Sequence, residues 1–339
     1  MPAHLIAAPR LRDLLAGARG KRIVVLGDAM LDVYLKGDAD RVSPEAPVPV
    51  VRVRERKLAL GGAANVAQNV VAAGARADLV AAVGGDGAAT NLRDLLRSLG
   101  ADSGGLVEVA RPTTTKTRVV ARAQQLIRID EETDDDLPPA EIEKIATAAE
   151  RAIGAADALV LEDYNKGVLV APLIERAIAA AGKRKIPIVV DPKYRNFFSY
   201  SGATVFKPNR RELEAALGAD VDLEHADALP AVVERLGVQA LLLTLSERGM
   251  ALIERGASGV HRIPTTAREV FDVVGAGDTV TAWLAAMLAA GAKPLEAAVV
   301  ANFAAGVVVT KSGAATVSAA EVLAAHADNA THTGPAGPA

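Results

Sequence analysis

The 339-residue sequence contains no cysteine, which excludes disulfide scaffolds, thiolate metal sites and cysteine nucleophiles and fits a reducing compartment. Aromatic residues make up only 3% of the chain, so a surface that stacks nucleic-acid bases is not expected. The net charge is −3, which gives no basic excess for binding nucleic acid. The longest apolar run, residues 282–292, is shorter than the ~20 residues that a membrane span needs. We therefore predict a cytoplasmic protein that binds neither nucleic acid nor a membrane.

Short apolar runs rich in β-branched residues alternate along the chain with segments of helical pattern. The runs are residues 22–27, 78–83, 157–162, 186–191, 203–206 and 239–245. The helical segments are residues 62–73, 88–99, 140–153, 171–182, 209–217, 225–236, 277–290 and 294–310. This alternation predicts a mostly parallel sheet covered by helices on both faces. We expect one α/β domain over residues 21–323, with a leading helix in residues 1–20 and a disordered tail in residues 324–339.

Two segments, residues 33–58 and 113–130, instead alternate polar and apolar residues. Such alternation is typical of half-exposed antiparallel strands. Pro44, Pro47 and Pro49 confine their part of the first segment to a loop or a sheet edge. Together the two segments predict a small sheet that projects from the main one as a lid.

The sequence DVVGAGDTVTAW (residues 272–283) carries the strongest chemical signal. Gly275, Ala276 and Gly277 form a small-residue turn that opens a helix, and the N–H groups of such a turn bind anions. Asp278 follows in the first helical turn, where it would repel a bound phosphate unless it has a chemical task. That task would be general-base catalysis on a hydroxyl that attacks a phosphoryl group. The alternative is an acidic residue that only stabilises the helix N-terminus.

Two further motifs each have a functional and a structural interpretation. In LGGAANVAQNVVAAG (residues 60–74), Gly61 and Gly62 allow close backbone approach, and the Asn65 amide can bind sugar hydroxyls. The alternative is a glycine-rich turn between a strand and a helix. In KPNRREL, Asn209 and Glu212 lie on one helical face and can hold Mg²⁺ through water, but they also match a capping box, which is the better interpretation of that motif alone.

Asp28 and Asp32 follow the first predicted strand, at the sheet edge where ligands of α/β proteins bind. Asp32 can accept hydrogen bonds from sugar hydroxyls, although a turn-forming aspartate would look the same. Other site types have no signal. A Walker A motif, a GxGxxG after the first strand, a GxSxG elbow and a metal-ligand spacing of histidines are all missing.

Taken together and in this order, GGAANVA with Gly74 and Gly84, then KPNRRE, then DVVGAGDTV resemble the signatures of the ribokinase (PfkB) family of sugar kinases over residues 20–322. Within that family the chain resembles the heptose-phosphate kinases. The segments that carry this narrower resemblance are RVSPEAPVPVV (41–51), GGAANVAQN (61–69), TKTRVVARAQQLIRID (115–130), DYNKG (163–167), DPK (191–193) and REVFDVVGAGDTV (268–280).

The resemblance implies a three-layer α/β/α fold and a kinase that uses ATP and Mg²⁺. The implied reaction phosphorylates D-glycero-D-manno-heptose 7-phosphate at O1, on the route to ADP-heptose and lipopolysaccharide. It also implies a homodimer that pairs through the lid strands. No HxGH-type motif of a nucleotidyltransferase occurs in the sequence, so we expect the kinase activity alone.

The resemblance also implies roles for individual residues. Asp278 would be the catalytic base, and Gly275, Ala276 and Gly277 would bind the γ-phosphate. The implied sugar-binding residues are Asp32, Gly61, Gly62 and Asn65, and the cations for the 7-phosphate are Arg41, Lys116 and Lys193. Asn209 and Glu212 would organise Mg²⁺, and the residues along the nucleotide would be Thr244, Ser246, Gly249, Asn302 and Gly306. Asp272, with the backbone of residues 311–316, would hold a monovalent cation such as K⁺.

Three positions differ from residues common among heptose kinases: Val33 in place of Arg, Glu162 in place of Ser, and Val274 in place of Thr. Val274 has no hydroxyl to offer a cation, and Val33 lies near the sugar side. Alternatives therefore remain open. They are a kinase for another sugar (fructose, ribose, 2-keto-3-deoxygluconate or a sugar phosphate), a non-catalytic sensor of nucleotide or sugar, and, more distantly, a dehydrogenase.

Overall fold

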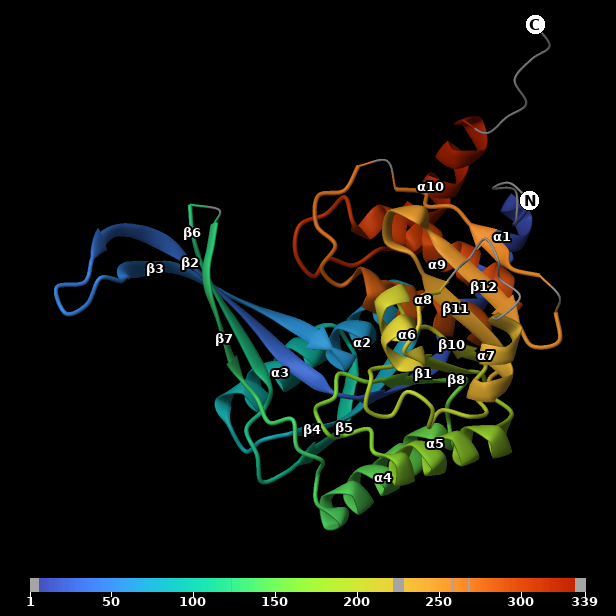
Figure 1. Cartoon of the computed structure of the whole chain (residues 1–339), viewed down its shortest axis with the longest axis horizontal. Coiled ribbons are helices and arrows are strands. Elements are labelled where there is room, and N and C mark those ends of the chain that lie inside the picture. The colour runs from blue at the N-terminus through green and yellow to red at the C-terminus, as the bar shows by residue number, and fades with distance from the viewer. Residues whose placement is uncertain (1–5, 123, 222–228, 258, 268, 333–339) are drawn as a thin grey trace, which may run out of the picture.

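A computed structural model describes residues 6–122, 124–221, 229–257, 259–267 and 269–332 (Figure 1). The helices are α1 (Ala8–Ala18), α2 (Ala63–Ala72), α3 (Gly87–Ser98), α4 (Pro139–Ile153), α5 (Ala171–Arg184), α6 (Arg210–Leu217), α7 (Leu229–Leu236), α8 (Ala276–Ala289), α9 (Pro294–Val308) and α10 (Ala319–His332). The strands are β1 (Arg22–Gly27), β2 (Ala29–Val42), β3 (Pro49–Gly62), β4 (Arg76–Val83), β5 (Asp102–Glu108), β6 (Thr115–Ala121), β7 (Gln124–Glu131), β8 (Ala158–Glu162), β9 (Ile188–Asp191), β10 (Val205–Phe206), β11 (Ala240–Thr244), β12 (Met250–Glu254) and β13 (His261–Ile263).

Nine strands form the main sheet in the order β13-β12-β11-β10-β9-β8-β1-β4-β5. All neighbours are parallel except β11–β12 and β12–β13, which are antiparallel. In β1, Ile23 and Val25 belong to one buried apolar cluster, whereas Val24 and Leu26 belong to another. Both faces of the sheet are therefore covered, which explains why its strands are continuously apolar.

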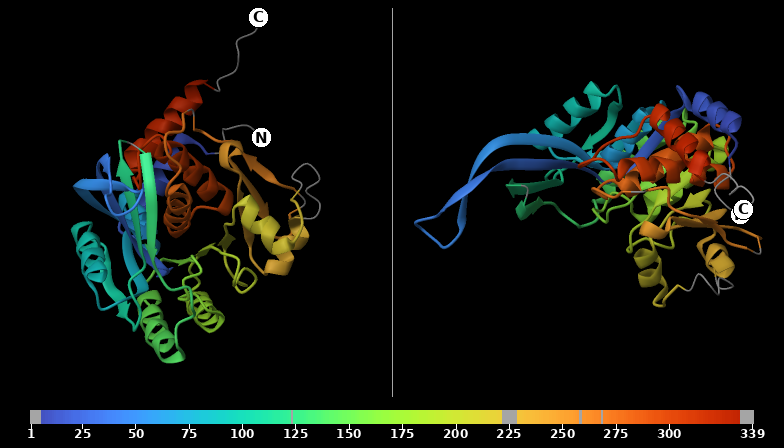
Figure 2. Two further views of the ribbon diagram at one scale, coloured as in Figure 1. Left: turned by 60° about the vertical axis from the view of Figure 1, so that its left-hand side comes forward. Right: turned by 90° about the horizontal axis from the view of Figure 1, so that it is seen from above.

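Helices on the two faces complete three layers, as the sequence predicts (Figures 1 and 2). Residues of α1, α2, α3, α8, α9 and α10 pack in one cluster, which includes the fully buried Trp283. Residues of α4, α5, α6 and α7 pack in the other. Within the described ranges, no helix is both long and apolar enough to cross a membrane.

The predicted strand and helix segments of the main domain are present, and the first four residues of the predicted helix 225–236 lie outside the described residues. Strands β5, β12 and β13 are additional. The disordered tail predicted from residue 324 is wrong for residues 324–332, because α10 extends to His332. Val322 is buried there, and the His326 ring contacts Phe303 and hydrogen-bonds to Ile6 O at 3.0 Å.

The lid is a separate four-stranded sheet in the order β3-β2-β6-β7, which projects from the main domain on the left of Figure 1. β2–β3 and β6–β7 are antiparallel, but β2 and β6 are parallel, so the predicted all-antiparallel lid is wrong at that pair. β2 starts at Ala29 and β1 ends at Gly27, so only Asp28 separates the lid from the main sheet. Every residue of β7 is exposed.

Candidate active site

Asp278 lies in the first turn of α8 and is 6% exposed. Its two oxygens accept different hydrogen bonds: Asn65 Nδ2 donates to Oδ2 at 2.6 Å, and the Tyr164 hydroxyl donates to Oδ1 at 2.9 Å. Burial raises the pKa of Asp278, and the two hydrogen bonds act against that rise. The result is a carboxylate of fixed orientation whose proton affinity is moved toward that of a general base.

The turn before α8 requires glycine. Gly275 has φ +76°, and a Cβ on it would lie 2.9 Å from Asn65 Nδ2, so a side chain here would disturb the hydrogen bond from Asn65 to Asp278. The first N–H groups of α8 have no partner within the helix and face its N-terminal end. The Ala276 N–H, however, donates to Val273 O at 3.2 Å, so this part of the predicted anion site has an internal partner.

Tyr164 is a site residue that the sequence-based assignment of roles omits. It belongs to the turn of residues 163–168, which Asp28 holds by accepting hydrogen bonds from the N–H groups of Tyr164, Lys166 and Val168 at 2.8, 3.0 and 3.3 Å. The only available signal was the DYNKG match, which marks the turn without showing its contact to Asp278. Burial and the nearby Asp278 raise the pKa of Tyr164, which therefore stays a hydroxyl donor.

Two more carboxyl groups lie beside Asp278, at the carboxyl ends of neighbouring strands. Glu162 ends β8 and Asp191 ends β9, and one oxygen from each lies within 4.8 Å of the others and of an oxygen of Asp278. Lys207 Nζ binds Asp191 Oδ2 at 2.8 Å, and Thr281 Oγ1 donates to the same oxygen at 3.2 Å. Burial acts to lower the pKa of Lys207, but the negative charges of Asp191 and Glu162 and the hydrogen bond to Asp191 together raise that pKa.

The predicted sugar-binding residues meet where β2 and β3 reach the main domain. A Cβ on Gly61 would lie 3.0 Å from Asp32 Oδ2, and a Cβ on Gly62 would lie 2.4 Å from Asp28 O. Both glycines therefore permit the close approach that the sequence predicts. Asp32 is 6% exposed and accepts from Arg118 Nη1 at 2.5 Å. Arg118 of the lid is thus ion-paired with Asp32, the carboxylate that is predicted to bind the sugar.

Asn209 and Glu212 form the capping box at the start of α6 that the sequence offers as the structural interpretation. Asn209 Oδ1 accepts from Glu212 N at 2.9 Å, and Glu212 Oε2 accepts from Asn209 N at 2.8 Å. The other oxygen, Glu212 Oε1, is ion-paired with Lys193, whose Nζ lies 5.2 Å from the centre of the Tyr164 ring. Lys193 therefore lies between the predicted Mg²⁺ residues and Tyr164, whose hydroxyl donates to Asp278.

The predicted nucleotide residues lie at the other side of the same sheet edge. Thr244 ends β11 and pairs with Asn209 in an isolated parallel bridge, and Ser246 follows with φ +55°. A Cβ on Gly249 would lie 2.1 Å from Ile263 O, and one on Gly306 would lie 2.3 Å from Thr266 Oγ1. Asn302 is 4% exposed and donates to Pro264 O at 2.9 Å. One segment, residues 263–267, therefore lies against Gly249, Gly306 and Asn302.

Asp272 connects two loops. Its Oδ1 accepts from Val274 N at 3.0 Å and its Oδ2 from Gly313 N at 2.9 Å. Lys311 Nζ lies in the second loop and donates to Thr316 O at 2.7 Å. Both carboxylate oxygens of Asp272, which is predicted to hold a monovalent cation, thus already accept hydrogen bonds from backbone N–H groups. The ammonium group of Lys311 lies in the second loop.

Two of the predicted phosphate cations lie in the lid. Lys116 is ion-paired with Asp130 at 3.1 Å and with Glu132 at 2.7 Å. Arg41 is exposed near the tip of the lid, where it pairs in register with Val50. At ~3.3 Å per strand residue, Arg41 lies about 30 Å along β2 from Asp32. Within one chain the structure therefore does not bring Arg41 to the sugar side.

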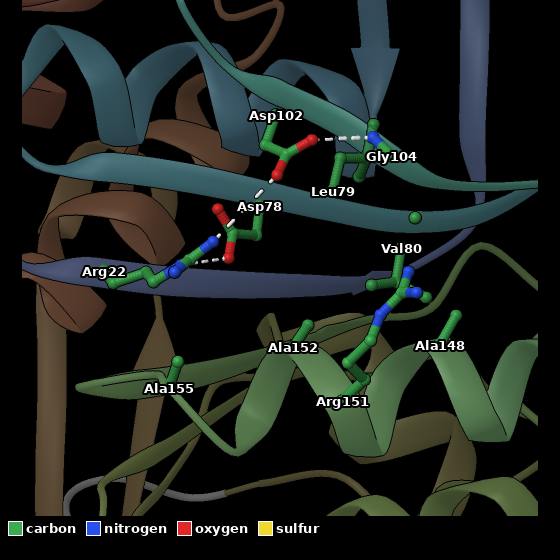
Figure 3. A pocket seen from close by; sticks show the side chains of 11 residues that line it. Arg22, Asp78, Leu79, Val80, Asp102, Gly104, Ala148, Arg151, Ala152 and Ala155 are labelled. Carbon is green, nitrogen blue, oxygen red and sulfur yellow. Dashed lines mark hydrogen bonds and ion pairs between the residues drawn. The ribbon is translucent and has the colours of Figure 1, made fainter.

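A cavity of about 300 Å³ lies away from this site, near the amino ends of β1, β4 and β5 and against α4 (Figure 3). The Arg22 guanidinium and the Asp78 carboxylate line it and bind each other at 2.5 Å. Ligands of open α/β sheets bind at the opposite, carboxyl edge of the strands. None of the predicted site residues lines this cavity.

Solved structures define the fold class. The chain is similar to Arabidopsis thaliana ribokinase complexed with ribose and ATP, with 19% identity, a TM-score of 0.70, and 91% of this chain and 99% of that chain covered. It is also similar to the tetrameric inhibited form of Escherichia coli phosphofructokinase-2, with 18% identity, a TM-score of 0.74, and 92% and 99% covered. The fold is ribokinase-like, as predicted.

The model of the pfkB family carbohydrate kinases matches residues 21–321, so the chain belongs to this family of carbohydrate kinases. Proteins named "Bifunctional protein HldE" are similar to it: 44% identity in Rhodospirillum rubrum over 94% of this chain, and 48% in Gluconacetobacter diazotrophicus over 89%. The chain spans 64% and 63% of the length of these two relatives.

Proposed function

We propose that this chain transfers the γ-phosphoryl group of ATP to O1 of D-glycero-D-manno-heptose 7-phosphate and so forms the 1,7-bisphosphate. The HldE relatives and the heptose-kinase segments of the sequence support the substrate. The observation that carries the reaction type is the buried Asp278, which Asn65 and Tyr164 orient at the start of α8. The product would serve ADP-heptose and lipopolysaccharide synthesis in the cytoplasm, where ATP is available.

In the proposed reaction the O1 hydroxyl attacks the γ-phosphorus, the O–H proton passes to Asp278, and the bond from phosphorus to the β-phosphate oxygen breaks to release ADP. The N–H groups at the start of α8 stabilise the charge on the transferring group. Lid residues around Asp32 and Arg118 cover the sugar and exclude water, which suppresses ATP hydrolysis.

Oxygen donors suit the hard cation Mg²⁺, so Asn209 and Glu212 fit a site that contacts the ion through water. When bound, Mg²⁺ would neutralise the negative charge of the nucleotide phosphates. Glu212 would have to share its carboxylate with Lys193. K⁺ binding at Asp272 stays a proposal. The ion would have to share the Asp272 oxygens with two backbone N–H groups and lie near the Lys311 ammonium.

The 7-phosphate needs cations of its own. Arg118 is the lid cation in contact with Asp32, and its guanidinium matches the geometry of a phosphate. Lys193 Nζ lies above the Tyr164 ring. Lys116 would first have to leave Asp130 and Glu132.

The lid also supports a homodimer. Val42, Val53, Ile127 and Ile129 of the lid are 67%, 47%, 55% and 47% exposed, and a second copy of the lid would bury them. Sedimentation velocity of the wild type and of Ile127→Asp tests this. We expect a dimer that the substitution converts to monomer; a monomeric wild type at micromolar concentration would refute the dimer.

The kinase proposal is tested by ³¹P NMR of the purified protein with ATP, Mg²⁺ and the heptose 7-phosphate, with fructose 6-phosphate, fructose and ribose in parallel. We expect a new anomeric phosphate signal with the heptose alone. Turnover of another sugar would show that the proposed substrate is wrong and would leave the proposed mechanism unchanged. Nucleotide binding without any turnover would favour a sensor.

A further inference from the structure

The cavity at the amino ends of β1, β4 and β5 has no part in the proposed reaction. Its volume of about 300 Å³ lies at the lower end of the range of about 300–1,000 Å³ that small-molecule sites occupy. Small residues on both walls leave this space open. Gly104 and Gly105 line the cavity from β5, and Ala148 and Ala152, four residues apart, line it from α4.

One part of the cavity wall is the Arg22 cluster, which consists of Arg22, Asp78 and Asp102. Arg22 Nε donates to Asp78 Oδ2 at 2.5 Å, and Arg22 Nη2 lies 4.0 Å from Asp102 Oδ2. Among the described residues, Asp78 Oδ1 and Asp102 Oδ2 accept no hydrogen bond, and the Arg22 side chain donates no other. Hydroxyl groups suit such a mixture, because each of them both donates and accepts. An ammonium group suits it less, because Arg22 already lies against both carboxylates.

The opposite wall carries a cation. Arg151 reaches from α4 toward the strands, apart from the Arg22 cluster (Figure 3). Within the described part of the chain, its guanidinium has neither an ion pair nor a hydrogen bond. A guanidinium of this kind is suited to the oxygens of a phosphate group. Val80 and Ala152 add an apolar part of the wall, which suits the C–H groups of a sugar ring.

We propose that this cavity binds a small sugar phosphate, with the phosphate on Arg151 and the sugar hydroxyls on the Arg22 cluster. The candidate active site lies at the opposite, carboxyl edge of the same sheet. A sugar phosphate in the cavity therefore leaves the active site open. Such a second site lets the protein respond to a sugar phosphate that it does not phosphorylate.

Isothermal titration calorimetry of the protein without nucleotide tests the proposal, with glucose 6-phosphate as the probe. We expect saturable binding by the wild type. Arg151→Gln should weaken it at least about tenfold, because a hydrogen bond to a charged group contributes that much. Ala152→Leu fills the cavity without changing its charge and should also weaken binding at least about tenfold. Arg97→Gln on α3 is the matched control, because this exposed arginine is ion-paired elsewhere and does not line the cavity.

The variants also distinguish the cavity from the candidate active site, since none of them touches that site. Circular dichroism establishes that each variant is folded. Arg151 is exposed, so its variant should keep the fold, and it decides alone if Ala152→Leu does not fold.

Three results would overturn the proposal. The first is no binding by the wild type at about millimolar concentration. The second is binding by a folded cavity variant within twofold of the wild type. The third is binding of inorganic phosphate as tight as that of glucose 6-phosphate, because the sugar would then contribute nothing. The titration contains no ATP, so a failure of the proposed kinase reaction leaves its result unaffected.

Discussion

The main sheet and the lid sheet differ both in their strands and in how they are stabilised. The main sheet is apolar on both faces, and helices bury both. The lid leaves all of β7 exposed and carries ion pairs such as Arg54–Asp38 and Arg128–Asp130 on its surface. The main domain is therefore stabilised by buried apolar packing, whereas the lid has little such packing. The candidate active site lies where the two meet.

The largest effect should come from the buried base in the main domain. Asp278→Ala should lower kcat by about 10²–10⁴-fold, because a general base contributes that much. This corresponds to roughly 2.7–5.4 kcal/mol of barrier at 1.36 kcal/mol per tenfold. Initial rates with ATP and the sugar phosphate measure the loss. Asp94→Ala on the surface of α3 is the control, and near-normal turnover of Asp278→Ala would remove this residue from the mechanism.

Packing of the main sheet predicts the next effect. Leu79 of β4 is 0% exposed, and Leu79→Ala should lower the free energy of unfolding by about 2–5 kcal/mol. Urea denaturation measures the change. In the lid, Ile129→Ala should cost much less in the monomer, since that side chain is 47% exposed. Equal losses at the two positions would mean that the lid is packed as the main domain is.

A smaller effect concerns pH. Burial, followed by the negative charge of Asp28, raises the pKa of Asp163 to about 6. An unfolded aspartate titrates near 3.9, so between about pH 4 and 6 the folded state binds more protons than the unfolded state. Stability should therefore fall as the pH rises through this window. Thermal unfolding from pH 4 to 7 measures the slope.

Asp163→Asn should flatten this slope, because it removes the titrating group. Tyr200→Phe is the control: it removes the hydroxyl that donates to Asp163 at 2.8 Å but keeps the carboxyl group. An unchanged slope in Asp163→Asn would assign the pH dependence to other buried carboxyl groups, such as Asp28, whose pKa burial also raises.

The smallest effect belongs to the lid surface. Arg54 and Asp38 form an ion pair at 2.9 Å whose side chains are 58% and 44% exposed. Solvent screens such a pair, so Arg54→Ala should change the free energy of unfolding by about 0.5 kcal/mol or less. Urea denaturation with and without 0.5 M salt measures it. A loss above 1 kcal/mol would show that the lid surface contributes to stability as the main sheet does.

The sequence predicted the main sheet well because each strand and helix has a local signature. β5 was missed because its Gly104–Gly105 pair breaks the apolar run. The end of α10 was missed because residues 324–332 are mostly small or polar. The parallel pairing of β2 with β6 has no local signature, since a period of two residues is the same in both directions.

The sequence predicted those residues of the candidate site that belong to recognisable motifs. Asp278 and Asn65 were named, but their direct hydrogen bond depends on how α2 and α8 pack. Tyr164 became visible only through the turn that Asp28 holds. The lack of a hydrogen-bond partner for Glu162 among the described residues had no signal, because a sequence does not show which buried groups are left without one.

Asp28 finally gives the molecule a mechanical property. This one residue joins β1 to β2, and its carboxylate holds the turn that carries Tyr164. A rotation of the lid about Asp28 would therefore also displace the turn whose Tyr164 hydroxyl orients Asp278. The angle of the lid and the orientation of the proposed base would then change together.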